Sequence, residues 1–384
     1  MVRTESIYLD HAAGTQLLPE VKKTIAEWAD TDVLNPSSIH RGGRDSAAML
    51  DESRMRIAKT LGAKPSEILF TSGGTEANNL AIMGVAEALQ ERGRHIITST
   101  TEHPSVLESC KALEKRGFQV SYLSCDEHGD IDLGDFLEAI SNDTILATFM
   151  WVNNETGLVH PMEKMVHYAH LRGVHFHCDA VQAMGHADIQ LQDIPFDSLT
   201  ISGHKIGAPA GIGALFMRKG QALSRRSFGG SQEQSVRSGT QNHLGAATLS
   251  VAVDQAARQR QTVINSHIEL TDILLDNLCT LPGIQINRSG RRYSPHILSC
   301  SFNNLDGEAL FIRLDMENIA VSNGAACSSG SQAPSHVLTA LGFEAGLAQA
   351  SLRISLGAET TKQEIETFCQ KLSQIVHSLH KETN

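Results

Sequence analysis

The sequence predicts an α/β protein in which a large domain holds a mainly parallel central sheet and a smaller α+β domain follows it. From residue 67 onward short apolar strands alternate with helices, and this alternation favours parallel strands covered by helices on both faces. After residue 245 long helical stretches replace the alternation. Because 384 residues are more than one hydrophobic core usually organises, we expect a large domain at 16–257 and a small one at 258–384, on which residues 1–15 pack.

The segments before the sheet are recognised by their helix signals. Pro19 suits the first turn of a helix, because the N–H that proline lacks is not needed there. Gly62 ends a second helix, since glycine adopts the left-handed conformation that often closes helices. The predicted elements are a strand at 7–9, a helix at 19–28, a loop at 35–43 and a helix at 46–61.

The central sheet is predicted from short apolar runs that are separated by helical stretches. The strands are expected at 67–71, 95–98, 118–123, 144–150, 174–178, 197–201 and 212–217. The helices between them are expected at 73–93, 105–116, 132–140 and 161–172. In such sheets ligands bind beyond the carboxyl ends of the strands. The residues that directly follow each strand are therefore the candidates for chemistry.

The C-terminal part has fewer strands and longer helices. Its helices are expected at 246–260, 267–281, 307–314 and 361–379, and its strands at 297–302, 319–322 and 351–356, with a loop at 323–334. This mixture of separate strands and helices predicts an α+β arrangement, which the strand at 7–9 is expected to join.

Composition excludes several classes of protein. Apolar residues make up 41% and charged residues 20% of the chain, which is typical of a globular protein. The net charge is −11 and no run concentrates Lys and Arg, so we expect no direct binding of nucleic acid. No apolar stretch approaches the roughly 18 residues that span a bilayer. The N-terminus lacks the apolar region of a signal peptide, so we expect no membrane partner and a cytoplasmic location.

The 7 cysteines do not indicate a disulfide framework, because their number is odd and no two form a C-x-x-C pair. For six of them we expect the role of a small buried hydrophobe. Cys327 differs, because small residues flank it on both sides in the sequence GAACSSG, which indicates an exposed segment. Two interpretations remain open from the residues alone: an incidental loop thiol or a nucleophile.

A glycine pair follows the strand at 67–71. The sequence Ser72-Gly73-Gly74-Thr75-Glu76 opens a helix there. Glycines let the backbone approach a ligand closely, and a helix N-terminus presents unpaired N–H groups, so the segment has the form of a phosphate cradle. The alternative is a plain helix start that is capped by Thr75, with Glu76 in the first turn.

Three further strand ends carry polar side chains. His103 follows the strand at 95–98, although a solitary histidine is more often structural. Asn154 follows the strand at 144–150 within NNETG. Asp179 and then Gln182 follow the strand at 174–178. A carboxylate that closes an apolar strand needs a partner, and a pyridinium N–H would be one.

Two histidines on that same strand raise the question of a metal. His175 and His177 share one face of the strand and lie before Asp179. No further ligand shares the spacing, and the 18 histidines are scattered through the chain. We therefore predict no metal site.

Lys205 follows the strand at 197–201, between apolar runs and among glycines. One interpretation is a loop lysine whose ammonium reaches water. The other is an amine that forms a Schiff base. Successive strand ends would then carry, in chain order, a phosphate cradle, a ring-facing histidine, an aspartate for a ring nitrogen and a Schiff-base lysine. Pyridoxal 5′-phosphate (PLP) needs these groups, so the conjunction favours the second interpretation.

With these groups in this order, the chain resembles the cysteine desulfurases, which belong to the class V aminotransferase group of fold-type-I PLP-dependent transferases. It resembles the branch with the longer cysteine loop, the housekeeping and nitrogen-fixation type. The motifs that carry the resemblance are YLDHAA, NPSS, FTSGGTEANN, TEHPSV, NNETG, DAVQ, SGHK, RSGTQN and SLRISLG, together with the segment around Cys327. They run nearly from end to end.

The resemblance implies a role for each candidate. Lys205 would carry PLP, Asp179 would pair with its ring nitrogen, Gln182 would contact its phenolic oxygen, and His103 would stack on its ring and move a proton. The phosphate would be held by Thr75, Ser202 and His204, with Thr240 reaching over from the second subunit of a homodimer. Glu76 and Asn154 would complete the cofactor pocket. The substrate carboxylate would meet Asn154 and Arg353, with Asn35 near it; an arginine fork suits a carboxylate.

The same resemblance implies the reaction. L-cysteine would give L-alanine and a persulfide on Cys327, which needs a thiolate because a thiol is a poor nucleophile. The persulfide would pass to an acceptor protein such as an iron–sulfur scaffold. Two alternatives share the motifs: a selenocysteine lyase, and a non-catalytic PLP-fold sulfur carrier.

Overall fold

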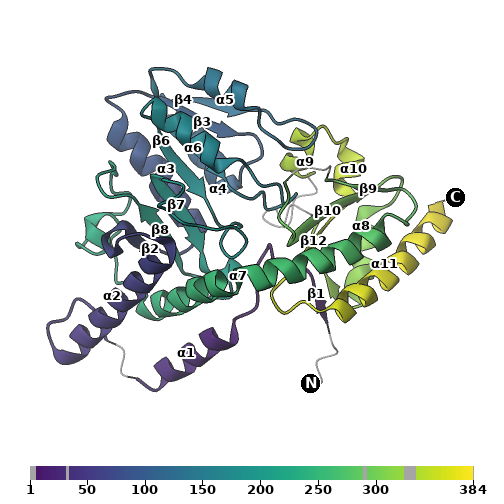
Figure 1. The fold of residues 1–384 in the computed structure, drawn as a ribbon, viewed down its shortest axis with the longest axis horizontal. Coiled ribbons are helices and arrows are strands. Elements are labelled where there is room, and N and C mark those ends of the chain that lie inside the picture. Colours follow the sequence, from purple (N-terminus) through teal and green to yellow (C-terminus); the bar gives the residue numbers. More distant parts are fainter. Residues whose placement is uncertain (1–5, 32–33, 289–291, 324–333, 384) are drawn as a thin grey trace.

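The computed structural model describes residues 6–31, 34–288, 292–323 and 334–383, and three sheets organise it (Figure 1). The largest has seven strands in the order β2-β8-β7-β6-β5-β3-β4. Their bounds are β2 Ile68–Thr71, β3 His95–Ser99, β4 Gln119–Leu123, β5 Thr144–Met150, β6 His175–Asp179, β7 Ser198–Ser202 and β8 Gly213–Met217. The pairs from β4 to β7 are parallel, and β8 is antiparallel to both β2 and β7. The prediction of a mainly parallel sheet is confirmed.

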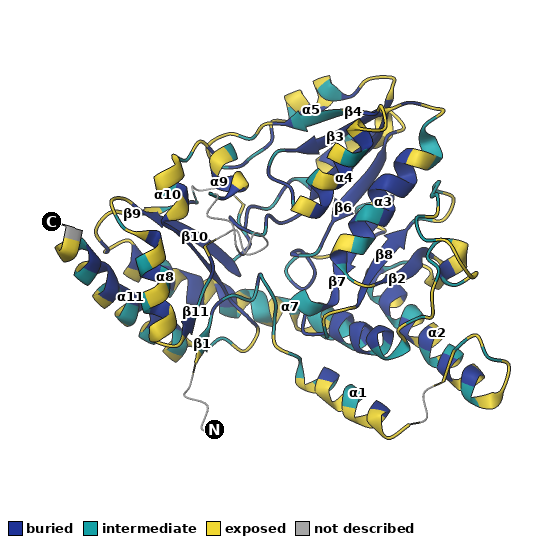
Figure 2. Ribbon diagram, turned by 180° about the vertical axis from the view of Figure 1, so that it is seen from behind, coloured by how far each residue is buried: buried dark blue, intermediate teal, exposed yellow. Residues whose placement is uncertain are grey.

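Helices cover both faces of this sheet, as the strand–helix alternation predicts. The helices of this part are α1 Pro19–Ala29, α2 Arg41–Leu61, α3 Gly74–Leu89, α4 Pro104–Glu114, α5 Leu133–Ala139 and α6 Met162–Leu171. One buried apolar cluster joins α3 and α4 to one face, and another joins α2, α5 and α6 to the opposite face. Apart from the edge strand β4, the strands between these layers are buried (Figure 2). This burial removes the apolar runs from water and is the main source of stability for the sheet.

Helix α2 begins earlier than predicted. It starts at Arg41, within the segment expected to be loop, and the Nδ1 atom of His40 accepts the N–H of Gly43 at 3.2 Å. The Gly42–Gly43 pair favoured a loop in the sequence. A Cβ atom at Gly43 would lie 2.3 Å from the carbonyl oxygen of Ser38, so the glycine permits a close approach of backbone.

Helix α7 is one helix of 36 residues, His243–Leu278, where the sequence predicted two. No glycine or proline follows Gly245 within it, so the polar residues near Asn265 do not interrupt it. Figure 1 shows α7 running along both the seven-stranded sheet and the C-terminal part. The predicted boundary at 257/258 falls inside this helix, and the division into two domains stays a prediction.

The C-terminal part contains an antiparallel sheet in the order β12-β10-β9, with β9 Ile284–Ile286, β10 Ile297–Phe302 and β12 Ser351–Ser355. Helices α8 Gly307–Met316 and α11 Lys362–Thr383 share its core with the second half of α7. Strand β1 (Ile7–Tyr8) pairs in parallel with β11 (Ile319–Ala320), and Leu9 is buried in the same core. The N-terminal strand therefore joins this part, as expected.

Three short elements here were not predicted: β9 and the helices α9 (His336–Ala340) and α10 (Ala345–Gln349). Within the described ranges, no helix combines the length and the apolarity that a bilayer span requires.

Candidate active site

A cavity of about 770 Å³ lies at the carboxyl edge of the central sheet. It gathers side chains that directly follow different strands, which is what the parallel order predicts. The predicted site residues that line it are Thr75, Glu76, His103, Asn154, Asp179, Gln182, Ser202, His204, Lys205 and Arg353. Asn35 and Thr240 are exposed and do not line the cavity of their own chain. Cys327 lies outside the described residues.

The glycine pair before α3 forms an open cradle. The residue that caps α3 is Gly73, and no side chain caps the helix, so the alternative of a cap by Thr75 is wrong. A Cβ atom at Gly74 would come within 2.9 Å of Val181 and 3.3 Å of Ser202. The helix therefore presents uncapped N–H groups beside a space that only a glycine leaves open, and this suits an anion such as phosphate.

Ser202 and His204 add polar atoms on the other side of the cradle. The Ser202 hydroxyl lies 3.0 Å from the Nδ1 atom of His204. Burial, and then the neighbouring charge of Lys205, lower the pKa of His204 to about 4. The ring is therefore neutral near pH 7 and can donate one hydrogen bond.

The carboxylate of Glu76 is used in an ion pair. It accepts two hydrogen bonds from Arg237, at 2.8 and 3.3 Å, and the N–H of Ser72 at 2.6 Å. Burial favours the neutral acid, but the contacts with Arg237 and Ser72 outweigh it and hold the pKa of Glu76 below its usual range. Glu76 thus lines the cradle as a neutralised anion, and Arg237 ties the segment before Thr240 to α3.

Asp179 ends β6 and is 5% exposed. Its Oδ1 atom accepts the N–H of Val181 at 3.0 Å, and its Oδ2 atom accepts an N–H of Asn78 at 2.6 Å. Both donors are neutral, so neither supplies the positive partner that a buried carboxylate favours. A protonated ring nitrogen would fit this carboxylate.

Lys205 ends a short 3₁₀ turn that follows β7. Its Nζ atom donates to the carbonyl oxygens of Ala12 and Ala13, at 2.6 and 2.7 Å. The amine is therefore held at the cavity wall by the N-terminal segment, and it is not the solvated loop lysine of the first interpretation. The sequence placed the lysine correctly but gave no sign of these two carbonyl groups.

Arg353 of β12 reaches the cavity from the C-terminal part and is 2% exposed. It donates to the carbonyl oxygen of Asn154 at 2.9 Å and to the carboxylate of Asp10 at 2.7 Å. Its Nε–H is buried and has no partner among the described residues. A buried donor without a partner is costly, so this N–H fits a carboxylate of a small ligand.

Two buried acids near the cavity were not singled out from the sequence. Burial raises the pKa of Glu155 to about 7, although the hydroxyl of Ser335 donates a short hydrogen bond to it. Burial also raises the pKa of Glu102 well above its usual range. Glu102 accepts from the Ser99 hydroxyl at 2.9 Å and from the N–H of Met150 at 2.8 Å. Both residues lie in the motifs TEHPSV and NNETG, but only their burial shows how they differ from surface acids.

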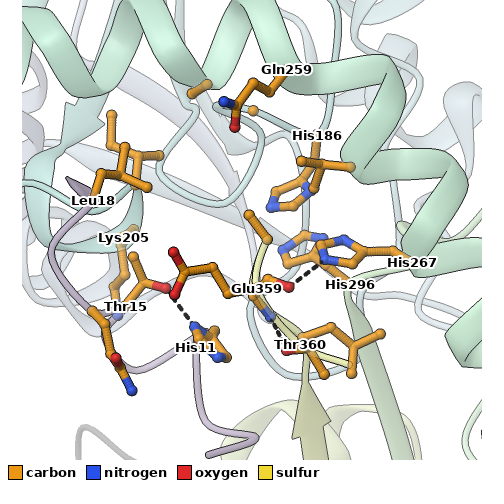
Figure 3. Close-up of a pocket in the computed structure, with 18 of the residues that line it drawn as sticks. His11, Thr15, Leu18, His186, Lys205, Gln259, His267, His296, Glu359 and Thr360 are labelled. Atoms are coloured by element: carbon orange, nitrogen blue, oxygen red, sulfur yellow. Dashed lines mark hydrogen bonds between the residues drawn. The ribbon is translucent and has the colours of Figure 1, made fainter. Parts of the chain in front are cut away.

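A second cavity, of about 250 Å³, shares Gln182 and Lys205 with the first (Figure 3). It is lined by His11, His186, His267 and His296, which come from four separate segments. The rings of His186 and His296 stack with their centroids 3.5 Å apart. These four histidines are far apart in the sequence, which gave no reason to group them. The tertiary structure brings them together around the second cavity.

This second cavity also fixes the orientation of Gln182. The amide N–H of Gln182 donates to the carbonyl oxygen of Ala12 at 2.9 Å, and its oxygen faces the Nε2 atom of His296 at 3.4 Å. The Ser294 hydroxyl lies 2.6 Å from the Nδ1 atom of the same ring. Gln182 is therefore held between the N-terminal segment and the C-terminal part.

The histidines of β6 join neighbouring strands. The two ring nitrogens of His177 lie 2.8 and 3.1 Å from the hydroxyls of Thr148 and Thr200. Those of His175 lie 2.9 Å from the Ser198 hydroxyl and 3.2 Å from the amide oxygen of Gln221. All four nitrogens are used in hydrogen bonds, and burial lowers the pKa of both rings.

The cysteine expectation holds with one correction. Cys110, Cys178, Cys300 and Cys369 are buried and Cys125 is half-buried, but Cys279 is exposed. Cys279 caps the C-terminus of α7, where the chain leaves the core of the C-terminal part. The prediction that Cys279 is buried is therefore wrong, because a residue at a helix end can face solvent.

The aminotransferase class-V family model matches residues 7–368 of this chain. A cysteine desulfurase IscS of Dictyoglomus turgidum is 40% identical over 374 residues, which cover 97% of this chain and 95% of that protein. A putative cysteine desulfurase IscS 1 of Bacillus subtilis is 40% identical over 377 residues, which cover 98% of this chain and 100% of that protein.

Solved structures share the fold over the same length. A NifS-like protein superimposes with a TM-score of 0.92 at 32% identity and covers 98% of this chain and 100% of its own. The crystal structure of DndA from Streptomyces lividans has a TM-score of 0.77 at 34% identity, with 91% of this chain and 99% of that chain covered.

Proposed function

Because this chain belongs to the aminotransferase class V family, among its cysteine desulfurases, we propose that it removes sulfur from L-cysteine with PLP as cofactor. The products are L-alanine and a persulfide on Cys327. The observation that carries the proposal is the position of Lys205, Asp179 and the uncapped start of α3 around one cavity.

The residues of the cavity fit the cofactor. Thr75, Ser202, His204 and the N–H groups at the start of α3 suit its phosphate, and Asp179 suits its ring nitrogen. When bound, PLP supplies an electron sink that stabilises the negative charge left on the substrate after loss of its Cα proton. Lys205 would bind the cofactor covalently, and Gln182 and His103 would complete the pocket around the ring.

The chain's own groups then position the substrate and move protons. Arg353 binds the carboxylate of L-cysteine, with its unpartnered Nε–H as the added donor and Asn154 beside it. The amine of Lys205 would take the Cα proton of the substrate. His103, as the first residue before α4, moves a proton at the substrate sulfur.

The sulfur atom passes to Cys327. In the balanced reaction the Cβ–S bond of L-cysteine breaks and an S–S bond to Cys327 forms. The proton lost by the Cys327 thiol ends on the former Cβ, which becomes the methyl group of L-alanine. The attacking group is the thiolate, because the thiol is a poor nucleophile.

A homodimer completes this site. Thr240 is exposed and does not line its own cavity, which supports its reaching into that of a second copy. Ile39 and Phe228 are 91% and 81% exposed, and apolar side chains so exposed favour burial against a partner. Light scattering of the purified protein tests the dimer, and Phe228→Asp is expected to weaken it.

The persulfide is delivered to a sulfur-acceptor protein, such as an iron–sulfur scaffold, in the cytoplasm. This part of the proposal rests on the names of the relatives, several of which are IscS proteins. It includes no direct role for nucleic acid or for a membrane.

The test uses purified protein, PLP and L-cysteine. Borohydride reduction should fix the cofactor to Lys205, as mass spectrometry of the denatured protein would report. Alanine should form in the wild type, and Cys327→Ser should lose sulfide release to a thiol reductant. A wild-type protein that takes up no PLP at saturation would refute the proposal. Faster turnover of selenocysteine, independent of Cys327, would point to a selenocysteine lyase, and cofactor binding without turnover to a sulfur carrier.

A further inference from the structure

A chain of buried hydrogen bonds runs beneath the cavity and joins two of its groups. The side-chain amide of Asn78, on α3, donates to the Asp179 carboxylate at 2.6 Å and to the Ser105 hydroxyl at 2.9 Å. The Ser105 hydroxyl lies 2.8 Å from the Nδ1 atom of His103. Asn78 is 1% exposed and Ser105 is 7% exposed. The contacts therefore form one protected path from Asp179 to His103.

The direction of each hydrogen bond in this chain is fixed. The backbone N–H of Ser105 lies 3.1 Å from the Nδ1 atom of His103, and a backbone N–H can only donate. Nδ1 is therefore an acceptor, and the Ser105 hydroxyl must donate to it as well. That hydroxyl in turn accepts from Asn78. In the neutral ring of His103 the proton consequently sits on Nε2.

The orientation of the Asn78 amide follows from the same contacts. A reversed amide would place its oxygen 2.6 Å from the Asp179 carboxylate, where two acceptors would repel. In the orientation described, the Asn78 oxygen is buried without a partner among the described residues. An unpaired buried oxygen is unfavourable, so the two donated bonds outweigh it.

We propose that Asn78 is a positioning residue for both Asp179 and His103. It donates a neutral hydrogen bond to the Asp179 carboxylate, and through the Ser105 hydroxyl it keeps the proton of the His103 ring on Nε2. The proposal deepens the proposed function, because it rests on these two groups facing one cofactor. Its consequence is that a change at Asn78 alters His103 through the Ser105 hydroxyl.

The first test needs no cofactor. In the apoprotein labelled with ¹⁵N histidine, the His103 signals are assigned by their loss in His103→Asn. At alkaline pH the wild type should show a ring protonated at Nε2. In Asn78→Ala and in Ser105→Ala the Nδ1 and Nε2 shifts should move toward those of a mixture of both tautomers. Both variants keep the backbone N–H of residue 105, which donates to Nδ1. Asn78→Ala should shift the signals more, because it frees the Ser105 hydroxyl to accept a proton from Nδ1, whereas Ser105→Ala leaves Nδ1 facing only that N–H donor.

Two matched controls lie on the same helices. Asn79 is half-buried and donates to the carbonyl oxygen of Thr75, and Ser109 donates to the carbonyl oxygen of Ser105. Asn79→Ala and Ser109→Ala should keep the wild-type tautomer. If Asn78→Ala and Ser105→Ala also keep it, the proposal is wrong.

The second test uses the reconstituted enzyme. Removing a hydrogen bond to a charged group should weaken the apparent affinity for PLP about 10-fold in Asn78→Ala. The pH midpoint of the cofactor's absorption band should shift in both Asn78→Ala and Ser105→Ala. An unchanged midpoint in variants that bind PLP would overturn the inference and leave the proposed function intact. A wild type that binds no PLP would end the proposed function, whereas the tautomer result in the apoprotein would still stand.

Discussion

The ion pair between Arg54 and Glu233 fastens the segment that leads to Thr240 onto α2, and removal of one partner tests its strength. Arg54 donates to the two carboxylate oxygens of Glu233 at 2.9 and 2.8 Å, and the N–H of Phe70 donates to the same carboxylate at 2.8 Å. The Glu233 side chain has 0% exposure and that of Arg54 has 13%. Water and salt therefore screen the pair only weakly.

The turn that carries Glu233 is strained, and the ion pair opposes the strain. Glu233, Gln234 and Ser235 have φ angles of 42°, 57° and 63°. A residue other than glycine in this left-handed conformation costs roughly 1–2 kcal/mol. The turn is expected to relax when the ion pair is lost, and the segment with Arg237 and Thr240 should move with it.

Arg54→Ala should destabilise the fold by about 3–5 kcal/mol, because it leaves a buried carboxylate without its cation. For 384 residues this corresponds to a midpoint roughly 5 °C lower in a thermal scan at pH 7. Arg54→Ala/Glu233→Ala should recover part of the loss, since no unpaired charge remains. Arg56→Ala is the matched control, because its exposed pair with Glu52 at 3.5 Å is worth at most about 0.5 kcal/mol. Equal losses in Arg54→Ala and Arg56→Ala would refute the reasoning.

Three more predictions concern the two cavities. Burial lowers the pKa of His186 to about 3 from its usual 6.5, so the unfolded chain binds the proton more readily. Melting temperature should therefore fall as the pH is lowered from 6.5, and less steeply in His186→Gln; parallel slopes would contradict this. Burial raises the pKa of Glu155 to about 7, so Glu155→Gln should melt at a higher temperature than the wild type above pH 7. The difference between the two melting temperatures should shrink as the pH is lowered toward 4.5, the usual pKa of a glutamate. Gly74→Ala should weaken PLP binding at least about 10-fold in a fluorescence titration, because its Cβ enters the cradle. Gly346→Ala, where a Cβ meets open space, is its control and should bind normally.

Much of the candidate site could be predicted because it depends on local pattern. Asp179 ends a strand, and Thr75, His103 and Lys205 each follow the end of a strand within a few residues. The alternation with helices predicts that these strands are parallel. Parallel strands end at the same edge of a sheet, so these four residues lie near one another at that edge. The structure gathers them around one cavity, as expected.

The errors in the predicted elements have the same physical origin as the successes. The Gly42–Gly43 pair looked like a loop because glycine is a poor helix former, yet packing against Ser38 keeps it in α2. The helices predicted at 246–260 and 267–281 are one helix, because helix propensity continues across the residues between them and α7 is not interrupted. Strand β9 is only three residues long and is stabilised by its pairing with β10.

The sequence by itself determined the type of sheet, the order of the strand ends and the candidate residues at its edge, because strand and helix periods depend on neighbours a few positions away. Only the tertiary structure decided which distant groups serve those residues: the carbonyl groups of Ala12 and Ala13 at Lys205, Asp10 at Arg353, and Asn78 between Asp179 and Ser105. Such partners are chosen by burial, since a polar group that leaves water must find whatever donor or acceptor the folded chain brings near it. No local pattern along the chain records that choice.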